Sequence, residues 1–218
     1  MINKILSILY KDFKIEISQS HLFFSVGLYV ISSIYIIYIS YQPTGILSSE
    51  HWISIFWVII LFSSISAVSK SFFQESGNRN YYYYYVLSAD ELIISKLIYN
   101  FLFIVFVTLL TFVFFTFLLG NFIISYSFFL LLLLIGSLSI SNCLTLISAI
   151  GHQVKNNSIL ISILSFPVII PILILLIKLS KIASSEFSWN LVQTDIYLLI
   201  LLNIILIALT KILFNFLW

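Results

Sequence analysis

The sequence predicts an all-α integral membrane protein with six transmembrane helices. Of its 218 residues, 61% are hydrophobic and 8% are charged, and the mean hydropathy is +1.16. Soluble domains carry roughly 25% charged residues. A helix needs about 20 predominantly apolar residues to cross a bilayer. Runs of about this kind cover residues 22–41, 51–69, 97–119, 124–150, 158–177 and 196–215.

Helices are the spanning structure that fits these runs. Lipid offers the backbone no hydrogen bonds, so a spanning chain forms either helices or a closed barrel. Barrel strands alternate apolar and polar residues, whereas the run LLLLLI at 130–135 does not alternate. Residues 1–218 are therefore predicted to form a single transmembrane domain.

The N-terminal residues 1–21 predict an amphipathic helix that lies on the membrane surface. The segment is too polar for the core of a signal peptide, because it includes Asp12 and Glu16. Its apolar face consists of Ile2, Ile5, Leu6, Leu9, Phe13 and Ile17, and its polar face consists of Lys4, Ser7, Lys11, Lys14 and Ser18.

The distribution of basic residues predicts the orientation in the membrane. Cytoplasmic loops of membrane proteins carry an excess of Lys and Arg. With six spans, eight of the ten Lys and Arg residues fall on one side, and Lys178 and Lys181 fall on the other. Both termini and the segment 70–96 are therefore expected in the cytoplasm. Short outer loops are expected near 42–50, 120–123 and 178–195.

The segment 70–96 interrupts the apolar chain and is the expected contact with a soluble partner. It includes Lys70, Glu75, Arg79, Asp90, Glu91 and Lys96. It also includes five consecutive tyrosines, Tyr81–Tyr85. A run of five covers every side of a helix, so it predicts either an interfacial aromatic cluster or a surface that stacks on a partner protein.

Several function classes are disfavoured because their residues are missing. No charged residue occupies the middle of a predicted span, which argues against proton-driven transport, a charged channel filter or intramembrane hydrolysis. The sequence contains no phosphate-binding loop and no metal-binding motif, so we predict no catalytic, cofactor or metal residues. The net charge of +2, with scattered basic residues, predicts no nucleic-acid partner. Any energy for transport has to come from another subunit.

Histidines and tryptophans lie at the edges of the predicted spans. His21, His51 and His152 are interpreted as interfacial polar residues rather than haem ligands. Trp52 and Trp57 are interpreted as part of an aromatic belt, because tryptophan is enriched at membrane interfaces.

Two spans carry residues that favour close packing or motion. Ser137, Ser141, Thr145 and Ser148 lie at helical spacing in the fourth span. Small hydroxyl residues of this kind allow helices to approach closely, although they can also line a polar path. Pro167 and Pro171 lie on one face of the fifth span. Each proline removes a backbone donor, so they predict either a static bend or a hinge.

These features together favour an ABC-2-type exporter permease half, and two segments resemble a known family. The stretch 67–100, through Phe72, Phe73, Glu75, Gly77 and Lys96, resembles the region between the second and third spans of the CcmB family. The stretch 151–175 is similar to that family's basic loop and proline-containing span. In length and layout the resemblance covers essentially the whole chain.

The resemblance implies a haem exporter permease of cytochrome c maturation in the bacterial inner membrane. It implies a CcmA-type ATPase, CcmC- and CcmD-type membrane subunits, a CcmE-type haem chaperone and a dimer of permease subunits. Haem and ATP would be handled by that complex. Glu75, Gly77 and Lys96 follow the family pattern at the ATPase-coupling segment, a cytoplasmic coupling helix, and Arg79 is added because it is charged and near the turn. Two alternatives remain open: a permease for a drug, lipid or glycan, and a non-transporting scaffold.

Overall fold

The structure is a computed structural model that describes residues 2–18, 21–42, 47–73, 87–153, 158–185 and 188–217. Its helices are α1 (Ile2–Ser18), α2 (His21–Tyr41), α3 (Ser49–Phe73), α5 (Ala89–Leu119), α6 (Tyr126–Gln153), α7 (Ser158–Ala183) and α8 (Trp189–Leu217). Six of them, all except α1, are long and apolar enough to cross a membrane. The predicted all-α class with six long apolar helices is therefore confirmed.

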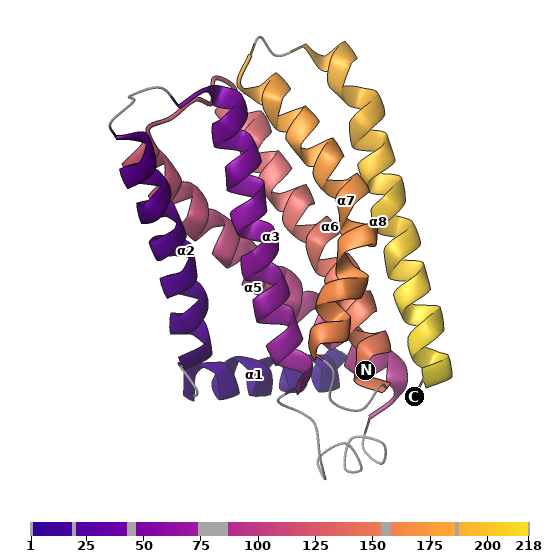
Figure 1. Cartoon of the computed structure of the whole chain (residues 1–218). Coiled ribbons are helices and arrows are strands. Elements are labelled where there is room, and N and C mark those ends of the chain that lie inside the picture. The colour runs from indigo at the N-terminus through magenta and orange to yellow at the C-terminus, as the bar shows by residue number, and fades with distance from the viewer. Residues whose placement is uncertain are drawn as a thin grey trace.

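The six long helices form a bundle, and α1 lies across one end of it (Figure 1). At this end, α3, α6 and α8 finish, and α2, α5 and α7 begin. We call it the α1 end. The position of α1 suits the predicted surface helix, because a helix across the end of the bundle is placed to lie in the plane of a bilayer that the bundle crosses.

The centre of the bundle is α6, which packs against α3, α5, α7 and α8. In its apolar part, 72% of the residues are buried, against 17% in α2. Small residues explain this position, because they let neighbouring backbones approach. The predicted packing stripe is confirmed in this respect: its members Ser137, Ser141, Thr145 and Ser148 are all fully buried.

The boundaries of α5 differ from the predicted span. The prediction starts the third span at residue 97, whereas α5 begins at Ala89 and runs for 31 residues. Similarly, α3 continues to Phe73. The predicted coupling segment 70–96 is thus divided, since its two ends belong to long helices. Residues 74–86 lie outside the described part of the chain.

The predicted outer loop 178–195 is mostly helical in the structure. Helix α7 continues to Ala183 and α8 starts at Trp189. Ion pairs accompany these extensions: Lys178 Nζ lies 2.7 Å from Asp195 Oδ2, and Lys181 Nζ lies 3.2 Å from Glu50 Oε2. Such pairs satisfy charged groups where the helices pass beyond the apolar layer.

The prediction that Trp52 and Trp57 form an aromatic belt is wrong. Both side chains are fully buried. The Trp52 indole N–H donates to the Gly120 carbonyl at 3.1 Å, and that of Trp57 donates to Ser180 Oγ at 2.9 Å. Apolar surface and one satisfied donor suit the core of a membrane bundle as well as its interface, so residue type alone does not separate the two locations.

Candidate functional site

The beginning of α5, which we call the α5 start (residues 88–96), makes several ion pairs at the α1 end. Ser88 is the N-cap residue. The Glu91 backbone N–H donates to Ser88 Oγ at 3.4 Å, and the Ser88 backbone N–H donates to Glu91 Oε2 at 3.2 Å. This reciprocal capping box satisfies two backbone donors that a helix leaves unpaired. The capping box explains why α5 begins at Ala89 rather than at residue 97, where the predicted span starts.

A buried ion pair joins the α5 start to α1. Lys96 Nζ lies 3.1 Å from Asp12 Oδ2, and the two side chains are only 3% and 6% exposed. Lys11, on the same helix as Asp12, places its Nζ 3.0 Å from the other carboxylate oxygen. Beside the pair, the rings of Phe13 and Tyr99 meet edge to face with centroids 5.3 Å apart. The contact between α1 and α5 is therefore both ionic and apolar.

Two longer ion pairs extend this arrangement. Lys4 Nζ of α1 lies 3.9 Å from Glu91 Oε2, and Lys211 Nζ of α8 lies 3.9 Å from Asp90 Oδ1. Both lysine side chains are 55% exposed. Exposed pairs contribute only about 0–1 kcal/mol each, whereas the loss of one partner from a buried pair is strongly destabilising. Together, the pairs connect the α5 start to α1 and to α8.

Among the residues predicted to contact the ATPase, Lys96 is the one that the structure describes. Glu75, Gly77 and Arg79 lie outside the described residues, as does the run Tyr81–Tyr85. Lys96 is on α5 and is buried against α1. This position orients Lys96 toward another part of its own chain, although the first residues of α5 lie within the predicted coupling segment 70–96.

The two prolines predicted as a hinge lie within α7. The helix runs through both of them from Ser158 to Ala183. Pro167 and Pro171 are both exposed, whereas the intervening Ile169 is buried. The prolines therefore occupy the outward face of α7. Whether they form a hinge or a static bend stays a prediction.

Three asparagines at membrane depth, which the sequence reasoning missed, make contacts between helices. Asn203 Nδ2 donates to Ser139 Oγ at 2.7 Å, and Asn142 Nδ2 donates to Asn203 Oδ1 at 2.9 Å, which links α6 and α8. Asn100 Nδ2 of α5 donates to Thr145 Oγ1 at 2.9 Å. An amide in an apolar run was the available signal, since such a group requires a partner in lipid.

The described residues contain no group of three or more His, Cys, Asp or Glu side chains that could hold a metal ion. His51 is exposed, and its Nδ1 lies 3.1 Å from Ser48 Oγ at the beginning of α3. This hydrogen bond is consistent with a polar residue at the end of a span. The side chains of His21 and His152 lie outside the described part.

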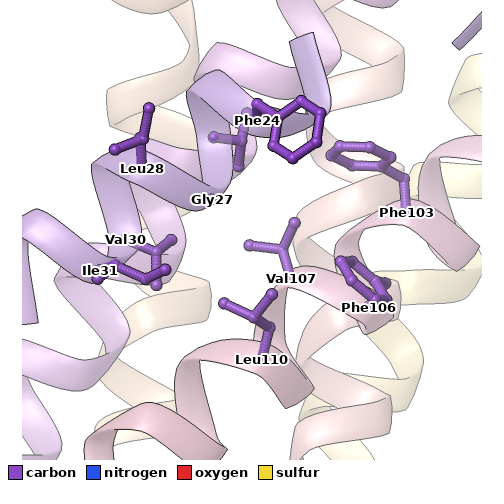
Figure 2. Close-up of a pocket in the computed structure, with 10 residues that line it drawn as sticks. Phe24, Gly27, Leu28, Val30, Ile31, Phe103, Phe106, Val107 and Leu110 are labelled. Carbon is purple, nitrogen blue, oxygen red and sulfur yellow. The ribbon is translucent and has the colours of Figure 1, made fainter. Parts of the chain in front are cut away.

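A groove of about 240 Å³ lies between α2 and α5. Figure 2 shows Phe24 and Val30 of α2 facing Phe103, Phe106 and Leu110 of α5 across it. All of the lining residues are apolar. The groove therefore offers no side-chain hydrogen bond or charge to a ligand, and its surface matches hydrocarbon.

Comparison with known proteins identifies the family of the chain. The model of the family described as CcmB protein matches residues 3–216, which is nearly the full chain. Neither a curated protein nor a solved structure matches the chain. In the haem exporter of cytochrome c maturation, CcmB is the permease subunit and CcmA is the ATPase. This multi-pass membrane protein therefore belongs to the CcmB family of haem exporter permease subunits.

Proposed function

We propose that this chain couples ATP hydrolysis by its CcmA partner to haem delivery through the segment between α3 and α5. The proposal is supported by the position of the two helices that flank the segment. Its flanking helices end and begin at the α1 end of the bundle (Figure 1). The α5 start that follows it is joined by ion pairs to α1 and α8. A movement of the segment between α3 and α5 would therefore be transmitted through α5 to α1 and α8.

The proposed fold is that of an ABC-2-type exporter permease, with α1 as the interfacial helix. Half of an exporter needs a second half, so we expect two copies of this chain in the complex. We also expect CcmC- and CcmD-type membrane subunits and a CcmE-type haem chaperone, with ATP hydrolysis driving release of the loaded chaperone. These partners are inferred from membership of the CcmB family. The α1 packing and the helix count support the fold.

We further propose that haem and ATP bind to other subunits. The sequence has no phosphate-binding loop for ATP. His51 has a structural partner in Ser48, and the groove between α2 and α5 has no charged side chain to pair with the carboxylates of a haem. The prolines of α7 are retained as the proposed hinge, because a missing backbone donor makes bending of that helix easier.

The expected location is the bacterial inner membrane, with both termini and the α1 end in the cytoplasm. Cysteine labelling checks this topology. In a Cys143→Ser background, Ser76→Cys should react only with a reagent on the cytoplasmic side. Ser184→Cys, just beyond the end of α7, should react only from the outside. The reason is the eight-to-two distribution of Lys and Arg. The opposite pattern of labelling would show that the orientation is inverted.

The coupling proposal is tested by reversing the charges of Glu75 and Arg79 together. Glu75→Lys with Arg79→Glu can keep an attraction within the segment while it repels a partner. Because one exposed pair contributes only about 0–1 kcal/mol, the double reversal is preferred to a single neutral substitution. We expect less CcmA to copurify in mild detergent, with unchanged membrane insertion.

A matched control is available at the opposite end of the bundle. Glu50 and Lys181 form an exposed ion pair, and Glu50→Lys with Lys181→Glu should leave CcmA copurification at the parent level. Normal copurification and normal release of the haem chaperone in the Glu75/Arg79 variant would remove those residues from the coupling site. If the parent chain itself failed to retain CcmA or to change its ATPase activity, a scaffold role would replace the proposal.

A further inference from the structure

Among the ion pairs between described residues, the pair of Asp12 and Lys96 is the one in which both side chains are buried. Most charged side chains of the described residues are partly exposed at the bundle ends, whereas this pair is almost completely covered. Charges taken out of water are costly unless they are well paired, and loss of one partner is strongly destabilising. The pair therefore favours the position of α1 in which Asp12 contacts Lys96.

The pair joins two elements with different surroundings. Helix α1 is amphipathic and exposes Leu6 and Tyr10, which suits contact with the bilayer surface. Its other side contributes Ile8 and Asp12, which are buried. Lys96 lies near the beginning of α5, shortly after the segment proposed to receive the ATPase. The ion pair thus joins the helix that suits the membrane surface to the helix that follows the segment proposed to receive the ATPase.

We propose that Asp12 and Lys96 are positioning residues that hold α1 and the α5 start together as one moving unit. The inference rests on the coupling function proposed above and makes it more specific. When the ATPase displaces the segment before α5, α1 moves with α5 across the membrane surface. Lys96 thereby acts through α1, and its role differs from the direct contact with the ATPase that its sequence position predicts.

Docking of α1 is measured by the reactivity of a cysteine at Ile8. Ile8 is 6% exposed, while Tyr10 on the same helix is 70% exposed. Ile8→Cys is placed in a Cys143→Ser background and labelled with a maleimide in the purified complex. Lys96→Met and Asp12→Asn should each raise the labelling rate of Ile8→Cys by about tenfold or more, since each removes the ion pair between Asp12 and Lys96 while one charge of that pair stays at a buried position. Tyr10→Cys, the matched control, should label at one rate in all variants.

Further variants test whether Asp12 and Lys96 act as a pair. The double variant Asp12→Asn with Lys96→Met should label no faster than either single variant, because the effects of residues in direct contact are not additive. Lys96→Arg, which keeps the positive charge, should label like the parent. In Lys96→Met and Asp12→Asn, CcmA should still copurify while ATP-dependent release of the haem chaperone is lost.

Three results would overturn the inference. Unchanged labelling of Ile8→Cys in Lys96→Met would show that the pair does not hold α1. Faster labelling with normal chaperone release would show that α1 need not move with α5. Loss of CcmA in Lys96→Met, with CcmA retained in Asp12→Asn, would assign Lys96 to direct contact with the ATPase. Failure of the parent complex to retain CcmA would instead overturn the proposed coupling function.

Discussion

Substitution of Gly136 by leucine is expected to prevent α3, α6 and α7 from packing as observed. A Cβ atom at Gly136 would lie 2.6 Å from Trp57 Cη2 and 3.0 Å from Leu176 Cδ2. Real Cβ atoms do not approach other heavy atoms to 2.6 Å, and 3.0 Å is already tighter than most of their contacts. The Trp57 ring cannot easily move away, because it is fully buried and its N–H is bonded to Ser180 Oγ at 2.9 Å.

The expected effect of Gly136→Leu is large. Inserting extra carbons into a packed core commonly costs about 1–3 kcal/mol, and sometimes more. Leucine adds a whole side chain at the point of closest approach, so we expect the upper part of that range or beyond. The thermal midpoint in detergent and the amount of protein in the membrane should both fall. Gly136→Ala should show a smaller change, since its helix propensity, better than that of glycine by about 1 kcal/mol, partly offsets the clash.

Gly27 of α2 provides the matched control. An added Cβ there meets no atom within 4 Å. Gly27→Ala should therefore be neutral or slightly stabilising, because alanine favours a helix over glycine. If Gly136→Leu matched the parent in thermal midpoint and yield, the close approach of α6 to Trp57 would not be a feature of the folded protein.

Substitution of Asn203 by leucine is expected to weaken the contact between α6 and α8. Asn203 is 4% exposed and sits between Ser139 and Asn142 at hydrogen-bonding distance. Leucine has the same number and branching of side-chain heavy atoms but removes both bonds between the helices. Interhelical hydrogen bonds in membranes contribute about 0.6–1.7 kcal/mol each. Because Asn142 would also lose the acceptor of its amide, we expect a clear fall in the thermal midpoint.

Two further variants test the reason for this effect. Asn215→Leu, on an exposed position of the same helix, should leave the thermal midpoint unchanged. Asn142→Leu combined with Asn203→Leu should cost less than the sum of the single changes, since removing both partners leaves no unpaired amide. Strictly additive losses would show that the two asparagines do not interact.

Hydropathy was sufficient to predict the class and the number of long helices, whereas the orientation inferred from charge stays a prediction. The reason is that these properties depend on the free energy of transfer from water to lipid, which is large when summed over the roughly 20 residues of a span. The same reasoning recognised α1, whose apolar and polar faces differ. It also predicted close packing along the stripe of Ser137, Ser141, Thr145 and Ser148, since small hydroxyl residues at helical spacing let helices approach closely.

The rotation of each long helix, and hence which residues meet, required the folded structure. Lipid and the protein core are both apolar, so a span that is apolar on every side does not reveal which side faces which. This is why the prediction for Trp52 and Trp57 at the membrane surface is wrong, and why the sequence does not reveal that Lys96 meets Asp12. Their actual neighbours, Gly120, Ser180 and Asp12, are far away in the chain. These contacts arise from helix packing. In a membrane, close packing of side chains and hydrogen bonds between helices, rather than hydrophobicity, determine which faces of the helices meet.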